Sequence, residues 1–216
     1  MTLALFDLDY TLLKGDSDHS WGLFLAERGL VDPGTFVERS DHYLAEYNAG
    51  RLNMQEFLAF QLAPLARAPH ETLVSLRSEY LVEKIHPFIT EPARELVAHH
   101  RERGDTLVVI TATCDFVTRP IADLFGIEHL IATELEFVDG AFTGGIVGEP
   151  CFREGKVTKL RAWMTETGHD LRGSWFYTDS RNDLPLLEEV DHPVAVNPDA
   201  VLEQEAHKRS WPIHRF

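Results

Sequence analysis

The spacing of apolar and polar residues predicts that short buried strands alternate with helices along most of the chain. Short apolar runs bounded by turn residues are typical of strands that are covered on both faces. They predict strands at Leu3–Leu8, Thr106–Ile110, Leu130–Ala132, Ser174–Tyr177 and Pro193–Val196. Helical spacing predicts helices between and after these strands, at Glu91–Arg103, Cys114–Leu124, Gly155–Thr167, Asp183–Glu189 and Asp199–Lys208. Two more short strands, Glu134–Phe137 and Phe142–Ile146, flank Asp139-Gly140, which predicts a hairpin.

One long segment after the first strand has helical spacing only. It predicts helices at Ser20–Arg28, Pro33–Ala49, Asn53–Leu65 and His70–Lys84. A crossover between parallel strands needs only about a dozen residues, so this segment is an inserted subdomain. We interpret the aromatic residues Phe57 and Phe60 as part of its core.

These elements together predict an α/β fold with an inserted α-helical cap. Alternating strands and helices of ordinary length favour a Rossmann-like parallel sheet with helices on both faces. We expect a core domain made of residues 1–13 and 88–216, and a cap made of residues 14–87. In such sheets ligands bind beyond the carboxyl ends of the strands.

The acidic composition argues against two classes of binding partner, nucleic acids and anionic membranes. The 216 residues include 20 Lys and Arg but 35 Asp and Glu, a formal net charge of −15. Nucleic-acid binders carry a basic surface and anionic membranes attract basic segments, so neither partner is favoured. The two cysteines form no CxxC pair, and Asp7 and Asp9 interrupt the apolar N-terminus. We therefore expect a cytoplasmic protein with reduced thiols and no signal peptide.

Reactive side chains follow the predicted strands. Asp7 and Asp9 end the first strand, Thr111 ends the second, and Asp179 and Asp183 follow the SWFY strand. Before that strand lies Lys156, in the sequence EGKVTKL. Two carboxylates, a hydroxyl, an ammonium group and a second acidic pair are the parts that metal-dependent phosphoryl transfer needs.

These motifs resemble those of the haloacid dehalogenase-like phosphohydrolases. DLDYT resembles the DxDxT signature of that family, and TDSRND resembles its fourth motif, usually written GDxxxD. Thr111 and Lys156 match the second and third motifs, and all four occur in the family's order. The position of the helical insert resembles the C1-capped branch that contains phosphoserine phosphatases. Two departures are Thr178 in place of the usual glycine, and Thr-Ala-Thr in place of Ser-Gly-Gly in the second motif.

The resemblance implies a role for each carboxylate. It makes Asp7 the nucleophile that becomes an aspartyl-phosphate, and Asp9 the acid and base that serves the leaving group and water. It implies Mg²⁺ as the cofactor, held by Asp7, the main-chain carbonyl of Asp9, and Asp179. It assigns Asp183 either to the surroundings of the metal or to orienting Lys156.

The resemblance also implies that Thr111, Lys156 and Asn182 bind the phosphate. Structural alternatives exist for every motif residue: the aspartates cap the following helices, Thr111 ends a strand, and Lys156 lies on a helix surface. The order of the four motifs favours the functional interpretation. A regulatory binding protein on the same scaffold is the non-enzyme alternative, but it should have lost a reactive residue, and none is lost.

The cap suggests a substrate. Asp16 and Asp18 follow the nucleophile and should face the leaving group, although both could instead cap the helix that comes next. In phosphoserine phosphatases an acidic residue at the position of Asp16 reads the substrate's amine. Since a doubly acidic rim suits an amino-alcohol phosphate, we rank histidinol phosphate first and phosphoserine second. The prediction is a Mg²⁺-dependent phosphatase of a small-molecule phosphate ester, with transfer to an acceptor other than water left open and the oligomeric state undetermined.

Overall fold

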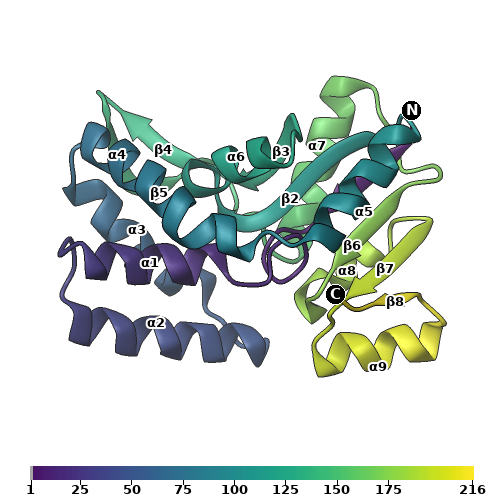
Figure 1. Cartoon of the computed structure of the whole chain (residues 1–216), viewed down its shortest axis with the longest axis horizontal. Coiled ribbons are helices and arrows are strands. Elements are labelled where there is room, and N and C mark those ends of the chain that lie inside the picture. The colour runs from purple at the N-terminus through teal and green to yellow at the C-terminus, as the bar shows by residue number, and fades with distance from the viewer. Residues whose placement is uncertain (1) are drawn as a thin grey trace.

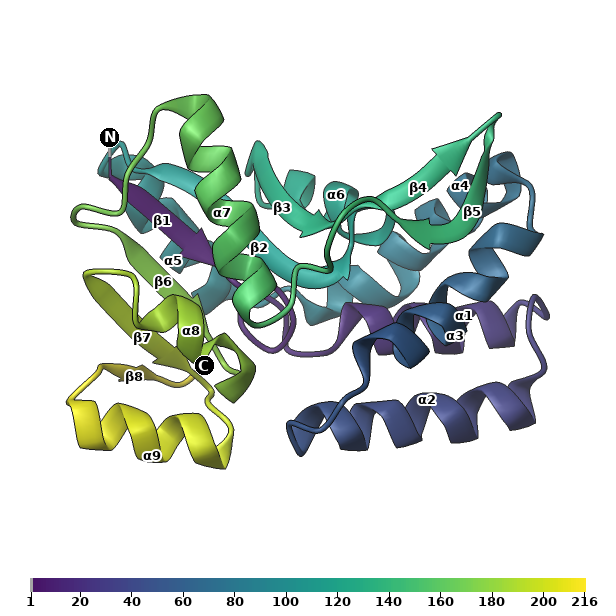
Figure 2. The same cartoon turned by 180° about the vertical axis from the view of Figure 1, so that it is seen from behind.

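The computed structural model describes residues 2–216. Its largest sheet has six parallel strands (Figures 1 and 2). The strand order is β3-β2-β1-β6-β7-β8, and every pairing is parallel. The strands are β1 (Leu3–Phe6), β2 (Thr106–Cys114), β3 (His129–Thr133), β6 (Trp175–Thr178), β7 (His192–Val196) and β8 (Ile213–His214). The parallel sheet expected from the sequence is confirmed; the two-residue edge strand β8 was not predicted.

Helices cover both faces of this sheet, as predicted. Alternate residues of a strand point to opposite faces. Leu3 and Leu5 of β1 pack in one apolar cluster, and Ala4 and Phe6 pack in the other. The first cluster includes α7 (Glu154–Thr167), α8 (Leu184–Leu187) and α9 (Ala200–Arg209). The second includes α5 (Glu91–Glu102) and α6 (Asp115–Leu124). A short 3₁₀ turn, Arg181–Asp183, precedes α8.

The insert is wholly helical except for its connections. Its helices are α1 (Ser17–Glu27), α2 (Pro33–Asn48), α3 (Met54–Arg67) and α4 (His70–Tyr80). The predicted single helix His70–Lys84 is corrected: the α-helix ends at Tyr80, and a π-helical turn over Leu81–Ile85 and a 3₁₀ turn over His86–Phe88 follow. Pro87 lacks the amide donor that a continuing α-helix would use there.

The two crossings between core and insert lie side by side. Leu13 pairs with Ile89 in an isolated antiparallel bridge, and the amide of Lys14 donates to the carbonyl of Phe88 at 2.9 Å. A side chain at Gly15 would lie 2.6 Å from the Phe88 ring, so any other residue here would have to displace that ring. We propose on this basis the division into a core of residues 1–13 and 88–216 and a cap of residues 14–87.

A hairpin links the core to the cap a second time. It consists of β4 (Leu135–Val138) and β5 (Ala141–Ile146), and it runs beside α3 and α4 (Figures 1 and 2). Asp139 and Gly140 both have positive φ, 49° and 84°, as the predicted two-residue turn requires. His70 of α4 lies 4.8 Å from the Phe137 ring, centroid to centroid.

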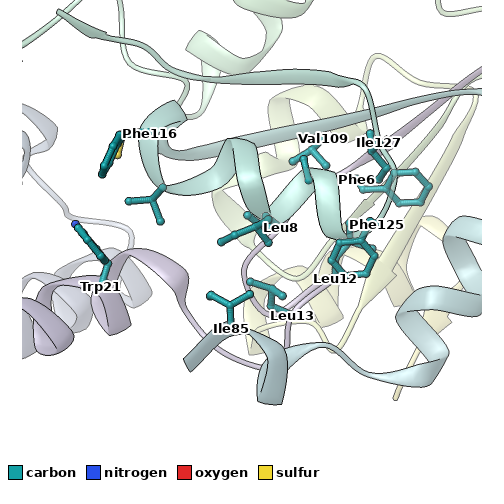
Figure 3. Packing of buried hydrophobic residues seen from close by; sticks show 14 of the residues in the cluster. Phe6, Leu8, Leu12, Leu13, Trp21, Ile85, Val109, Phe116, Phe125 and Ile127 are labelled. Carbon is teal, nitrogen blue, oxygen red and sulfur yellow. The ribbon is translucent and has the colours of Figure 1, made fainter. Parts of the chain in front are cut away.

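One apolar core continues from the sheet into the cap. Leu8, Leu12 and Leu13, in the turn after β1, join Phe6 and Val109 of the sheet to Ile85 of the returning segment (Figure 3). Farther out, Trp21 of α1 meets Phe116 of α6 with ring centroids 6.2 Å apart. This packing, with the two connections and the hairpin, holds the cap over the carboxyl ends of the strands.

Candidate active site

The predicted strand-end residues converge at one edge of the sheet. β1 lies between β2 and β6, so the residues after β1 and β6 are neighbours. The amide of Asp7 donates to the carbonyl of Tyr177 at 2.9 Å, which fixes the end of β1 against β6. Asp7, Thr111 and Asp179 all line a single pocket between the core and the cap. The structure therefore brings these three predicted side chains together, and their roles stay predictions.

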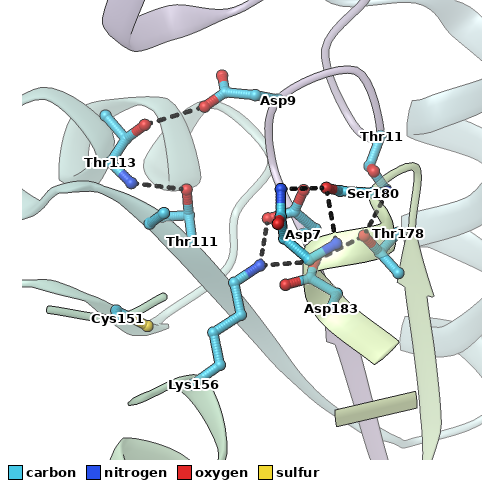
Figure 4. Close-up of polar contacts among 12 residues, drawn as sticks. Asp7, Asp9, Thr11, Thr111, Thr113, Cys151, Lys156, Thr178, Ser180 and Asp183 are labelled. Atoms are coloured by element: carbon cyan, nitrogen blue, oxygen red, sulfur yellow. Dashed lines mark hydrogen bonds and ion pairs between the residues drawn. The ribbon is translucent and has the colours of Figure 1, made fainter. Parts of the chain in front are cut away.

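Lys156 joins two buried carboxylates. Its Nζ lies 2.8 Å from Oδ1 of Asp7 and 2.8 Å from Oδ2 of Asp183, and Thr178 Oγ1 donates to the same Asp183 oxygen at 2.6 Å (Figure 4). Burial acts to lower the pKa of Lys156, but Asp183 and Asp7 outweigh it and raise that pKa well above its ordinary value. The lysine is therefore an ammonium ion beside Asp7.

The position of Lys156 depends on a tight start to α7. A side chain at Gly155 would lie 2.1 Å from the carbonyl oxygen of Pro150, so only glycine lets the helix begin this close to the preceding loop. That loop ends at Arg153, whose φ is 52°. The helix thus places Lys156 in its first turn, against the end of β1, where the macrodipole disfavours a cation but two carboxylates compensate.

Asp9 is held by two donors. Its Oδ1 accepts from the amide of Ser17 at 2.6 Å, and its Oδ2 accepts from Thr113 Oγ1 at 3.0 Å. Burial, followed by the charge of Asp16, raises the pKa of Asp9 to about 7. A carboxyl group with that pKa exchanges protons near neutrality, as a general acid and base must.

Thr113 is a site residue that sequence reasoning missed. It lies two residues after Thr111 on β2, so both threonines point to the same face of the strand. Both line the pocket, and the amide of Thr113 donates to Thr111 Oγ1 at 3.3 Å. The second hydroxyl in Thr-Ala-Thr was the available signal.

Asp7 and Asp179 form a pair suited to a divalent cation. Burial, then Asp7 and Asp183, raises the pKa of Asp179 well above its ordinary value, because the carboxylates are crowded together. In residues 2–216 no three His, Cys, Asp or Glu side chains are grouped as metal ligands. Two carboxylates and a main-chain carbonyl still fit Mg²⁺, which keeps several waters and needs few protein oxygens.

The contacts of Asp183 bear on its two predicted roles. Both Lys156 and Thr178 donate to its Oδ2, and Asp183 is absent from the residues around the pocket. These contacts support the role of orienting Lys156, and a place for Asp183 in the surroundings of the metal stays a prediction.

Asn182 lies where the core meets the connection between α2 and α3, which we call the cap tip. Its Nδ2 donates to Ser180 Oγ at 3.2 Å and to the carbonyl of Tyr47 at 3.4 Å. Its Oδ1 accepts from Arg153 Nε at 3.2 Å, and Arg153 also donates to the carbonyl of Gly50. These contacts bind the α2–α3 connection to the core; the predicted phosphate contact of Asn182 remains a prediction.

Asp16 and Asp18 both line the pocket on its cap side. Asp16 also caps α1, since it accepts from the amide of His19 at 2.8 Å, so the alternative predicted for it holds as well. Asp18 lies inside the first turn and accepts from Gln61 of α3 at 3.0 Å. Burial, then Asp16, raises the pKa of Asp18 to about 8. Phe57 also lines the pocket, which corrects its assignment to the cap core, whereas Phe60 is buried as expected.

Comparisons with known proteins agree with this geometry. The family model described as haloacid dehalogenase-like hydrolase matches residues 4–188. A histidinol-phosphatase of Neisseria meningitidis serogroup C is 44% identical over 99% of this chain and 98% of its own length. A phosphoserine phosphatase of Mycobacterium tuberculosis is 34% identical over 99% of this chain and 70% of its own length.

A solved structure has the same fold throughout. A Bordetella pertussis protein, described as of unknown function, superposes with a TM-score of 0.93 at 43% identity, covering 99% of each chain. In residues 2–216 there is no helix with the length and apolar character to cross a membrane.

Proposed function

The chain belongs to the haloacid dehalogenase-like hydrolase family and is a phosphatase, and we propose that its substrate is histidinol phosphate. The observation that carries this proposal is the charge of the pocket. At the phosphate end Lys156 pairs with Asp7. At the cap end Asp16 and Asp18 line the wall, and no lysine or arginine is found among the lining residues. A leaving group that carries a positive charge and no carboxylate fits that end.

The main competitor is phosphoserine, the substrate named for one relative. Its carboxylate would need a cation in the cap. Arg51 is exposed and pairs with Glu46 at 2.7 Å, and Arg67 is not part of the pocket. Because Asp16 and Asp18 offer a carboxylate no positive charge and favour a cation, the amino alcohol is the better match.

The first half of the proposed reaction transfers phosphate to the protein. An Asp7 oxygen attacks phosphorus, the bond to the leaving alkoxide breaks, and protonated Asp9 donates its proton to that oxygen. Lys156 neutralises charge on Asp7 and the phosphoryl oxygens, and the hydroxyl of Thr111 donates a hydrogen bond to the phosphate, while that of Thr113 donates to Asp9. A bound Mg²⁺, for which we propose Asp7, the Asp9 carbonyl and Asp179 as ligands, would supply further positive charge for the phosphate.

The second half regenerates the enzyme. The Asp9 carboxylate takes a proton from water, the water oxygen attacks phosphorus, and the bond between phosphorus and Asp7 breaks. Phosphate leaves with the alcohol already released. The contacts of Tyr47 and Gly50 with the core hold the cap at the pocket, and we propose that this excludes acceptors larger than water and so favours hydrolysis over transfer. A cytoplasmic location and the absence of nucleic-acid partners remain predictions from the sequence.

The test is phosphate release from histidinol phosphate with Mg²⁺ present. We expect turnover by the wild-type protein and a loss of at least about 1,000-fold in Asp7→Asn, since a nucleophile has no substitute. Asp139→Asn, on the exposed hairpin turn, is the matched control and should keep full activity. Phosphate release by Asp7→Asn at the wild-type rate would contradict the assignment of Asp7 as nucleophile. No phosphate release by the wild-type protein would contradict histidinol phosphate as the substrate.

A further inference from the structure

A buried acceptor in the cap has no partner. Gln61 of α3 lines the pocket and is only 5% exposed. Its Nε2 donates to the carbonyl of Asp18 at 2.9 Å and to Asp18 Oδ1 at 3.0 Å, which fixes the orientation of the amide. Its Oε1 is buried, and no group within residues 2–216 donates to it. Leaving such an acceptor unpaired costs stability, so a ligand that donates to it would explain why the glutamine is there.

The neighbouring carboxylate is also short of donors. Within the described chain, Gln61 supplies the one hydrogen bond that the Asp18 carboxylate accepts. Within residues 2–216 no lysine or arginine lines the pocket, so the Asp18 carboxyl group has no cationic partner there. Asp18 and Gln61 therefore present two acceptors next to each other at the cap end of the pocket.

An aromatic surface lies beside these acceptors. Tyr43 of α2 and Phe57 of α3 both line the pocket, and their rings meet edge to face with centroids 5.5 Å apart. Aromatic side chains of this kind pack well against a flat ring, and their faces attract cationic ones. Acceptors beside aromatic rings fit a ring that carries N–H donors.

We propose that Asp18 and Gln61 form a subsite for a nitrogen-containing aromatic ring on the leaving group, with Tyr43 and Phe57 as its wall. In this arrangement the protonated ring donates one N–H to the Asp18 carboxyl group and the other to Gln61 Oε1, while Asp16 binds the amine. The subsite deepens the proposed function and rests on it, because histidinol carries an imidazole ring as well as an amine. Specificity then arises because a substrate without the ring would leave the acceptors of Asp18 and Gln61 without hydrogen-bond donors.

The test compares two substrates that differ only in the ring. Histidinol phosphate has the imidazole; alaninol phosphate has the same amine and phosphate without it. We expect Asp18→Asn and Gln61→Leu each to lower kcat/KM for histidinol phosphate by about tenfold or more. For alaninol phosphate we expect a change within about threefold in Gln61→Leu, since the ring contact is missing, and a smaller fall than for histidinol phosphate in Asp18→Asn. Gln55→Leu, the same substitution at an exposed position of α3, should change neither.

The possible outcomes separate the subsite from the substrate assignment. An equal fall on both substrates, or no fall on either, would overturn the subsite. Equal kcat/KM of the wild-type protein for the two substrates would also overturn the subsite, but it would not contradict the phosphatase activity. A wild-type protein that hydrolyses phosphoserine but not histidinol phosphate would overturn the proposed substrate, and the subsite with it. If Gln61→Leu does not fold, the near-isosteric Asp18→Asn decides.

Discussion

Lys156 Nζ lies 2.8 Å from Oδ1 of Asp7, although the two residues are 149 positions apart and both are buried. This ion pair joins Asp7, the proposed nucleophile at the end of β1, to the first turn of α7. It also sets the charge of the site, because Lys156 is the ammonium that compensates Asp7 and Asp183.

Removing this ammonium should destabilise the fold as well as stop catalysis. Lys156→Gln leaves Asp7 and Asp183 buried without their counter-charge, and breaking a buried pair in this way costs about 3–5 kcal/mol. The pKa of Asp7, already raised to about 7 by burial, should rise further, because Lys156 lowers it. The folded state then binds more protons than the unfolded chain above the ordinary pKa of 3.8, so the loss should be smaller at pH 5 than at pH 8.

Urea unfolding at the two pH values measures this effect. Lys208→Gln, which removes an ammonium from an exposed pair with Glu205, is the matched control and should change stability little. A Lys156→Gln protein as stable as the wild type at pH 8 would contradict the compensating role of the lysine.

The pH profile should report the proton on Asp9. The donor must be protonated to serve the leaving group, and its pKa is about 7, so kcat should decline as the pH rises through 7. After burial, Asp16 is the largest cause of that raised pKa. Asp16→Asn should therefore lower the pKa of Asp9 and move the alkaline decline to lower pH. The matched control Asp139→Asn should leave the alkaline decline where it is. If Asp16→Asn also leaves it there, Asp16 does not set the pKa of Asp9.

Magnesium should stabilise the protein through Asp179. Burial and then the charges of Asp7 and Asp183 raise the pKa of Asp179, and a cation between Asp7 and Asp179 offsets these negative charges. Binding only to the folded state at 100 times Kd adds about 2.7 kcal/mol, a rise in Tm of about 5–10 °C for a chain of this size. Asp179→Asn should lose most of this rise, and excess chelator should remove activity. Full activity in chelator would rule out the metal requirement.

The cap tip should loosen when its link to the core is cut. Arg153 donates to Gly50 of the cap and to Asn182 of the core. In Arg153→Ala the amides of residues 47–52 should exchange with solvent faster, and KM should rise because the closed form is less populated. Arg172→Ala, whose arginine is 90% exposed, is the control. Unchanged exchange at residues 47–52 would show that other contacts hold the tip.

Much of the core site was predictable because parallel strands end at one edge. Asp7 and Asp179 follow β1 and β6, and Thr111 follows the predicted strand Thr106–Ile110, although β2 itself continues to Cys114. These three strands are adjacent, so the residues after each predicted strand are enough to group the side chains. Asp139-Gly140 predicted its hairpin for a local reason too, since the turn depends on two adjacent residues with positive φ.

The cap side of the site was not predictable in the same way. Gln61 reaches Asp18 from a different helix, and Arg153 reaches Gly50 across 103 positions, so both contacts depend on how the cap packs. Phe57 was misassigned because helical spacing shows that a residue faces inward, but not whether that side is core or pocket. The helix after His70 changed form because Pro87 limits how the chain returns to the sheet.

The ratio of kcat/KM for histidinol phosphate to that for phosphoserine tests the central claim most directly. With Mg²⁺ at neutral pH, the acidic cap end predicts a ratio well above one in the wild-type protein. In Asp16→Ala the ratio should fall by about 10- to 100-fold, since one charged hydrogen bond to the amine is lost and the like-charge repulsion of the phosphoserine carboxylate is relieved. A wild-type ratio below one, or a ratio that Asp16→Ala leaves unchanged, would contradict it.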